Sequence, residues 1–333
     1  MHTIPAKIQR WHSDDIDDQS ARLDGWSQEY RQLGCGKFIG EVSTVQGPRM
    51  TIAGERTNQS LHEQLVPPPD SLVFGLVLNR DDALQVNRRP VGTASLIVLE
   101  GGREYDFRTE GCTELLGVVL ESAMFRDKDS GTYGKDIQRA LVEGVVPLAH
   151  GAAGQLRRLW VQMSEFLQVG EVWPGSLPLP LLAETALNNI LVALSMSAGE
   201  DIPALPQSAG RQARVVQQAI RFMHENLGDN FSMSEVCAAA HVSERTLQYH
   251  FENCLGTSPH QYLKAMRLNA ARRMLRLGAE QAGLQLPAPS IADIAAQCGY
   301  DHPSRFAGDY RRLFGVLPSE TLRAGALRQP ESA

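Results

Sequence analysis

The chain has few of the features that mark an exported or disulfide-bonded protein. It carries only five cysteines in 333 residues, and none of them forms a CxxC pair. Cys237 and Cys298 fall at apolar positions of expected helices, which indicates small buried side chains in a reducing compartment. The N-terminal residues MHTIPAKIQRWHSDDIDD contain no apolar run of a signal peptide. These absences predict a cytoplasmic location.

A membrane-spanning segment and the common catalytic motifs are missing as well. The most apolar long stretch, residues 180–198, contains Glu184 and two asparagines, so it is not expected to cross a bilayer. We find no GxSxG, HExxH, Walker or Rossmann motif and no H-x-H pair. A cupin-type metal enzyme, which needs clustered His and Glu ligands, would have only His62 beside Glu63 in the expected sheet. We therefore expect no enzyme, no catalytic residue and no metal site.

Charge is distributed unevenly along the chain. The formal net charge is −6. Residues 211–333 nevertheless hold 14 Lys and Arg against 11 Asp and Glu, whereas residues 1–210 hold 18 against 27. A mildly basic C-terminal part behind an acidic N-terminal part is compatible with nucleic-acid binding at one end only.

The first 130 residues show a pattern of short β-rich runs separated by turn signals. The clearest runs are residues 73–78, 94–100, 104–109 and 114–122. This spacing predicts an antiparallel β-sandwich or small barrel, of cupin-like type. From about residue 136 the pattern becomes helical, with apolar stripes over 154–168 and 180–198 that predict a helical hairpin. Two explanations for these stripes remain open: packing on the chain's own sheet, or an interface with a second subunit.

A change in composition separates the two halves of the chain. Residues 198–212 are rich in Pro, Gly, Ser and charge, which is typical of a linker. We accordingly expect an α+β protein with a sensing and dimerisation domain over residues 1–200. A linker over 201–212 then leads to an all-α domain over 213–325.

That second domain repeats one helical pair. Residues 232–259 align with residues 290–318, first at an offset of 58 and then, after one added residue in the turn, at an offset of 59. Two short helices joined by a tight turn are a helix-turn-helix, whose second helix enters a DNA major groove. Two in tandem predict two successive contacts with double-stranded DNA. The matched pairs are Val236 with Ile294, Ala240 with Cys298, Leu247 with Phe306, Phe251 with Tyr310 and Gly256 with Gly315.

Local signals place the ends of these helices. Ser232 and Glu235 form a capping-box pattern, and Pro303 suits the first position of a helix. His241 and Gly299 occupy equivalent turn positions, where we expect positive φ. Residues 258–277 predict one long helix that connects the two pairs.

Helical periodicity then separates buried from outward positions. If Leu247, Phe251, Phe306 and Tyr310 form the core of the two pairs, their polar neighbours face outward. Arg can bind guanine and Gln can bind adenine through two hydrogen bonds each, so we expect base contacts in both second helices. Gly308 offers no side chain, so we expect the second helix pair to depend more on phosphate contacts. The predicted base contacts are Arg245, Gln248, Tyr249, Ser304 and Arg305; the predicted phosphate contacts are Ser243, Arg272, Arg273, Arg311 and Arg312.

These residues resemble a known family. Ser243, Arg245, Leu247, Phe251, Gly256 and Pro259 are similar to the first half of the AraC/XylS-type DNA-binding domain, and Cys298-Gly299-Tyr300, Phe306 and Phe314-Gly315 resemble its second half. The resemblance covers roughly residues 211–323, with Tyr300 where Phe is usual and a longer spacer over 278–289. It implies a sequence-specific transcriptional regulator that binds DNA, a small-molecule effector and RNA polymerase, and that can form a homodimer. A scaffold built on the repeated helices is the less favoured alternative, because two copies are too few for a solenoid.

The N-terminal half carries a second resemblance. Trp26, Tyr30, Gln32-Leu33, Gly36-Lys37-Phe38 and Gly40-Glu41 are similar to a segment of regulators related to the ethanolamine-utilisation activator. That similarity implies a ligand-sensing activator whose inducers are ethanolamine and adenosylcobalamin. Repression instead of activation remains an open alternative.

Overall fold

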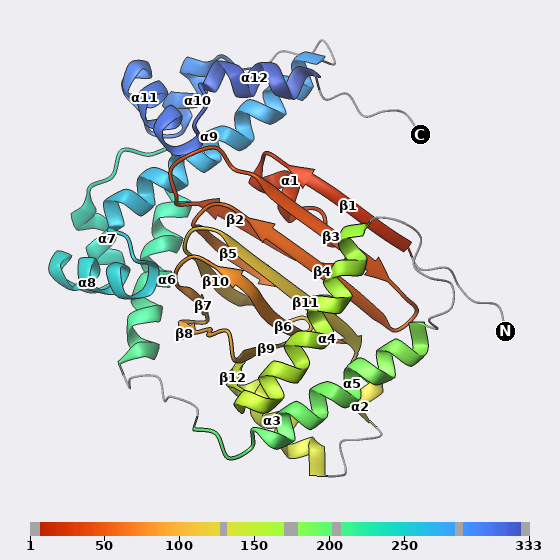
Figure 1. Cartoon of the computed structure of the whole chain (residues 1–333). Helices are drawn as coiled ribbons and strands as arrows, with labels where there is room; N and C mark the ends of the chain where they lie inside the picture. The colour runs from red at the N-terminus through yellow and green to blue at the C-terminus, as the bar shows by residue number, and fades with distance from the viewer. Residues whose placement is uncertain (1–6, 127–131, 170–178, 202–207, 284–288, 328–333) are drawn as a thin grey trace. The chain divides into compact units, whose positions relative to one another are not determined.

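The computed structural model describes residues 7–126, 132–169, 179–201, 208–283 and 289–327. Residues 202–207 of the expected linker and 284–288 of the spacer lie outside this set. The chain divides into two compact units (Figure 1). The first comprises Met1–Tyr30 and Phe38–Ala204, and the second comprises Arg31–Lys37 and Leu205–Ala333.

The first unit contains two antiparallel sheets, which confirms the predicted β-rich sandwich. The larger sheet has the strand order β1-β3-β4-β11-β6-β9-β12 and the smaller the order β2-β5-β10-β7-β8. The strands are β1 (Lys7–Ser13), β2 (Ser27–Gln32), β3 (Gly40–Gln46), β4 (Met50–Thr57), β5 (Leu61–Val66), β6 (Ser71–Arg80), β7 (Leu84–Val86), β8 (Arg89–Pro90), β9 (Ser95–Glu100), β10 (Tyr105–Thr109), β11 (Thr113–Glu121) and β12 (Val145–Pro147).

The four strands expected from sequence correspond to β6, β9, β10 and β11. Others are less apolar: β2 has the sequence SQEYRQ and β5 has LHEQLV. Such strands are recognised by their pairing, for example β5 with β10 through Leu65 and Tyr105. Sheet formation therefore depends on partners that a single run of sequence does not contain.

Helices cover one face of the larger sheet (Figure 1). They are α3 (Thr132–Glu143), α4 (His150–Val169) and α5 (Leu179–Met196), while α1 (Ile16–Ser20) and α2 (Ala123–Arg126) are short. Trp160 and Leu187 are completely buried in the same core as Phe74 and Val118 of the sheet. The apolar stripes of α4 and α5 therefore pack on their own sheet. Leu181, Val192 and Met196 of α5 nonetheless stay exposed.

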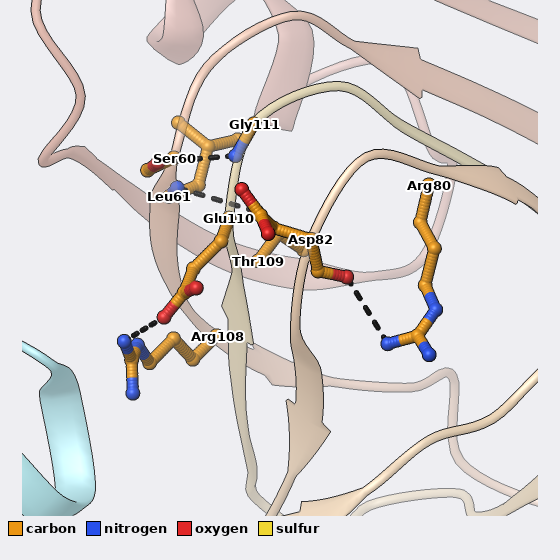
Figure 2. A network of polar contacts seen from close by, with 8 residues as sticks. All are labelled: Ser60, Leu61, Arg80, Asp82, Arg108, Thr109, Glu110 and Gly111. Atoms are coloured by element: carbon orange, nitrogen blue, oxygen red, sulfur yellow. Dashed lines mark hydrogen bonds and ion pairs between the residues drawn. The ribbon is translucent and has the colours of Figure 1, made fainter.

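A polar network closes the turn that follows β10 (Figure 2). The backbone N–H of Leu61 donates to Thr109 Oγ1 at 3.2 Å, and that of Gly111 donates to Ser60 Oγ at 3.1 Å. Arg108 pairs with Glu110 beside them. These bonds fix the start of β5 to the end of β10.

The second unit is helical, as the fold class predicts. Its helices are α6 (Ala209–Glu225), α7 (Met233–Ala239), α8 (Glu244–Leu255), α9 (Pro259–Gly283), α10 (Ile291–Gln297), α11 (Pro303–Phe314) and α12 (Pro318–Leu327). The long connecting helix is confirmed as α9. The apolar core has two parts: one joins α6, α7 and α8 to the start of α9, and the other joins the rest of α9 to α10 and α11. Among the described residues, no helix has both the length and the hydropathy to cross a membrane.

Candidate nucleic-acid interface

The first helix-turn-helix is formed by α7 and α8. Its start is a complete capping box: Glu235 N–H donates to Ser232 Oγ at 3.4 Å, and Ser232 N–H donates to Glu235 Oε2 at 2.8 Å. The hydrogen bonds that the Glu235 carboxyl accepts from the backbone N–H and the hydroxyl of Ser232 lower the pKa of this exposed carboxyl. The turn passes through His241 at φ 54°, which confirms the expected left-handed backbone. Ser243 then caps α8 by accepting from Thr246 N–H at 3.3 Å.

The second helix-turn-helix, α10 and α11, uses the same devices. Ser290 and Asp293 form a capping box that the sequence analysis missed, although they lie at the offset of 58 from Ser232 and Glu235. The turn residue Gly299 has φ 73°. Helix α11 begins with Pro303 in its first turn, as expected. Each recognition helix is therefore set at a defined angle to the helix before it.

The core positions of both motifs are fully enclosed. Leu247 and Phe251 of α8, and Phe306 and Tyr310 of α11, are each 0% exposed. The Tyr310 hydroxyl, buried with the ring, donates to Thr321 Oγ1 at 2.9 Å. Because these side chains fix one face of each helix inward, the opposite face is set toward solvent.

Helix α8 presents the three predicted base contacts on that outer face. Arg245 and Tyr249 are exposed and Gln248 is half-buried. Gln248 Nε2 donates to Glu252 Oε1 at 2.6 Å, so its amide is engaged within the helix. The second amide N–H and Oε1 of Gln248 are the groups left to bind an adenine.

Helix α11 presents a smaller set. Ser304 and Arg305 are exposed, and a Cβ at Gly308 would meet nothing within 4 Å. Asp309 of α11 pairs with Lys264 of α9, with Nζ to Oδ1 at 2.5 Å. This pair neutralises a carboxylate that would repel a phosphate.

The predicted phosphate contacts fall into two groups. Arg311 and Arg312 are exposed, and Arg273 is half-buried. Arg272 differs from the expectation: it is 9% exposed, and its guanidinium lies 4.9 Å from the centroid of the Phe314 ring. A cation held over a buried aromatic ring supports the domain interior. Arg272 therefore supports the packing of the domain, and its contact with a phosphate stays a prediction.

Arg267 joins the two motifs. Its guanidinium donates to the carbonyl of Asp229 at 3.0 Å, ahead of α7, and to that of Gly299 at 3.3 Å, in the second turn. Burial lowers the pKa of Arg267. A Cβ on Gly299 would lie 2.7 Å from Arg267 Cζ, so glycine is needed there for space as well as for φ. Arg267 therefore has a structural role within the domain.

The segment Arg31–Lys37 belongs to this unit although it occurs early in the chain. The backbone of Gln32 exchanges hydrogen bonds with the side chain of Asn269, at 3.1 and 3.0 Å. Gln32 Nε2 also donates to the carbonyl of Leu313 at 2.8 Å. We call this segment the strap. It contacts the connecting helix α9 and the last turn of α11.

Comparison with known proteins identifies the domain. The family model for a helix-turn-helix domain matches residues 236–324. A probable thc operon regulatory protein of Rhodococcus erythropolis is 30% identical over 225 residues, which cover 65% of this chain and 63% of that protein. An XylDLEGF operon transcriptional activator of Pseudomonas putida is 36% identical over 107 residues, 32% of this chain and 30% of that protein.

Residues 236–324 form a helix-turn-helix domain that is similar to those of AraC/XylS-type transcriptional regulators. The chain spans less than two thirds of the length of either relative. Among solved structures, the AdpA DNA-binding domain in complex with a target DNA is 26% identical, with a TM-score of 0.30, and the match covers 35% of this chain and 97% of that one. The capping boxes, turns and buried aromatic residues described above form the framework of this helix-turn-helix domain.

Proposed function

We propose that this chain is a ligand-responsive transcriptional activator that acts in the cytoplasm as a regulator of the AraC type. The observation that carries the proposal is the tandem pair of recognition helices, α8 and α11, each fixed inward by buried apolar residues. An outward arginine near the start of each helix, Arg245 or Arg305, supports major-groove binding.

The two recognition helices would make different numbers of base contacts. Arg245, Gln248 and Tyr249 read bases from α8, and Ser304 and Arg305 read fewer from α11. Ser243 at the start of α8, an arginine of α9 and two arginines of α11 contact the DNA backbone, since phosphate contacts carry affinity and register instead of specificity. The proposed phosphate contacts are Ser243, Arg273, Arg311 and Arg312.

Selection from random double-stranded DNA by the full chain tests this directly. We expect one enriched site with a strongly defined half and a weakly defined half. Enrichment of no sequence above background would contradict the proposal. In a reporter assay with the selected site upstream of a promoter, an activator raises transcription with RNA polymerase, whereas a repressor lowers it.

The strap offers a route from ligand to DNA. Tyr30, the last residue of the first unit before the strap, donates to both Glu55 oxygens at 3.0 and 3.1 Å. Two residues later, Gln32 is bonded to α9 and to the end of α11. A ligand that changed the partners of Glu55 would therefore act on a chain segment fixed to the DNA-binding domain, and would shift its states by its differential affinity for them.

Asn269→Ala tests the strap, because it removes both bonds to the Gln32 backbone. We expect DNA binding to persist and the response to inducer to fall. Thr185→Ala on α5 serves as a control with a similarly small change. An unchanged inducer response in Asn269→Ala would contradict the role of the strap.

The small molecules that this regulator would bind, and its pairing with a second chain, complete the proposal. Similarity at Trp26, Tyr30 and Gln32 to the ethanolamine-utilisation activators supports ethanolamine as an inducer. Adenosylcobalamin is far larger than the cavity described below and would need a different site. The exposed apolar residues of α5 support pairing of two chains.

A further inference from the structure

A cavity of about 80 Å³ lies between the two sheets of the first unit. Its floor is a row of small residues aligned on three neighbouring strands of the larger sheet: Ala53 on β4, Gly117 on β11 and Gly75 on β6. A Cβ at Gly117 would meet only the carbonyl oxygens of Ala53 and Phe74, at 3.7 and 3.9 Å. Glycine in the middle of a strand is unfavourable for the sheet and often marks close approach of a ligand. The apolar walls include Leu65, Val73, Ile97, Leu99, Phe107 and Val119.

Two carboxyl groups enter this apolar space from opposite sheets. Glu55 comes from β4 and Glu63 from β5, and both line the cavity. Glu63 is 4% exposed, and the nearby charges that act on its carboxyl, those of Glu55 and Asp106, are both negative. Glu55 accepts from Gln19 Nε2 and from the Tyr30 hydroxyl, each at 3.0 Å. A buried carboxyl without a partner is costly unless a ligand supplies one.

The polar groups that line the cavity include two carboxyls and no basic side chain, whether Lys, Arg or His. The Oε1 atom of Gln28, another lining residue, is buried without a hydrogen-bond partner among the described residues. Burial raises the pKa of Glu55, and burial together with the nearby charge of Glu55 raises the pKa of Glu63 well above its usual value. The cavity therefore offers hydrogen-bond acceptors and negative charge, and lacks a matching cation.

We propose that this cavity binds a small organic ammonium ion, whose N–H groups donate to Glu63, Glu55 and Gln28 while its hydrocarbon part packs on the apolar walls. A single water needs roughly 10–15 Å³ on the same measure, so the space suits a ligand of about five or more non-hydrogen atoms. A divalent metal ion would need about six oxygen ligands, which these walls do not supply. The site stands on its own geometry; its role as the inducer site rests on the function proposed above.

Thermal unfolding of the full chain at about pH 8 tests the site with three matched probes: n-butylamine, n-butanol and butyrate. A ligand that binds only the folded state raises the midpoint with its concentration. We expect butylamine to raise it and the alcohol and the carboxylate to leave it unchanged. Equal stabilisation by butanol, or stabilisation by butyrate or by magnesium ions alone, would overturn the proposal.

Two variants locate the binding. Glu63→Gln keeps the shape and removes the charge, and Gly117→Leu fills the floor. We expect calorimetric titration to show at least tenfold weaker amine binding for each. Glu121→Gln, an equal change of charge at the exposed end of β11, is the control and should bind as the parent does. Unchanged affinity in Glu63→Gln would overturn the assignment even if Gly117→Leu failed to fold.

The thermal stability of Glu63→Gln also tests the site in the absence of ligand. The groups around Glu63 are Glu55 of β4, Asp106 of β10 and Tyr30 of β2. Because folding raises the pKa of Glu63, its contribution to stability is present below the ordinary carboxyl value of 4.5 and is lost as pH rises through the raised value. We expect Glu63→Gln to unfold at a higher temperature than the parent at about pH 8, with the difference shrinking toward pH 4.5. If Glu63→Gln were less stable than the parent at pH 8, this would contradict the inference that the Glu63 carboxyl has no compensating partner in the folded protein.

DNA affinity separates this inference from the proposed function. If butylamine binds and Glu63→Gln abolishes binding, but DNA affinity and reporter transcription do not respond, the cavity is confirmed and the sensing role fails. If DNA binding responds to some other ligand while no amine binds, the sensing role survives and this inference fails.

Discussion

The two helix-turn-helix motifs of the second unit share a backbone conformation and differ in their outer surfaces. Each begins with a capping box, turns through a residue in the left-handed region and ends its recognition helix at a glycine with positive φ. The equivalent residues are Ser232 and Ser290, His241 and Gly299, and Gly256 and Gly315.

The outer faces do not follow this repetition. Helix α8 carries Arg245, Gln248 and Tyr249, whereas α11 carries Ser304, Arg305 and a glycine at position 308. Capping boxes and turns with positive φ require backbone geometry that few residue types satisfy, whereas outward positions accept many residue types. The difference indicates that α8 and α11 have similar backbone surroundings but unequal numbers of side chains that can contact bases.

Gly299→Ala should have the largest effect of these variants. It tests whether the turns of the two motifs tolerate the same residue. The left-handed backbone costs an alanine about 1–2 kcal/mol. The new Cβ must also displace the Arg267 guanidinium, 2.7 Å away, from its two carbonyl acceptors. We expect a loss of roughly 2–3 kcal/mol in the free energy of unfolding, measured by denaturant titration of the full chain.

His241→Ala is the matched change in the first motif. The native residue there already has a Cβ at φ 54°, so we expect a change within about 0.5 kcal/mol. Equal losses at the two turns would break the distinction between a glycine required for space and a turn that only needs positive φ.

Arg245→Ala and Arg305→Ala sharpen the comparison of the two reading faces. Losing a bidentate contact to guanine costs about 1–3 kcal/mol at one base position. We expect this loss for Arg245→Ala, with relaxed preference at that position, and a smaller loss for Arg305→Ala. Fluorescence anisotropy with single-base variants of the selected site measures both. The assignment of unequal reading is wrong if the two variants lose specificity to the same extent.

Arg312→Ala tests the holding role of the second motif. Removal of one phosphate contact should weaken binding to all sequences alike and reduce the slope of log affinity against log salt by about 0.9. Arg49→Ala in the first unit makes the same charge change and should leave the slope unaltered. A loss confined to one base position would instead place Arg312 among the base readers.

Local features of both motifs could be predicted from the sequence because they depend on neighbours within a few residues. The Ser232 capping box, Pro303 and the turn glycine are of this kind. The neutralisation of Asp309 and the interior position of Arg272 depend on helix α9 and on Phe314. The strap could not be predicted at all, since Gln32 and Asn269 are 237 residues apart in the chain.

Gly308→Ala should have the smallest effect and isolates the difference at the centre of α11. A glycine inside an exposed helix costs about 0.5–1 kcal/mol relative to alanine, and nothing lies within 4 Å of the new Cβ. We expect this variant to be more stable by that amount, with unchanged DNA preference. Gly308→Gln should then add a preference for adenine at one position of the weak half-site, measured by repeating the DNA selection. If glutamine adds none, α11 lies too far from the base edges to read them, and the second motif holds DNA for a reason other than its missing side chain.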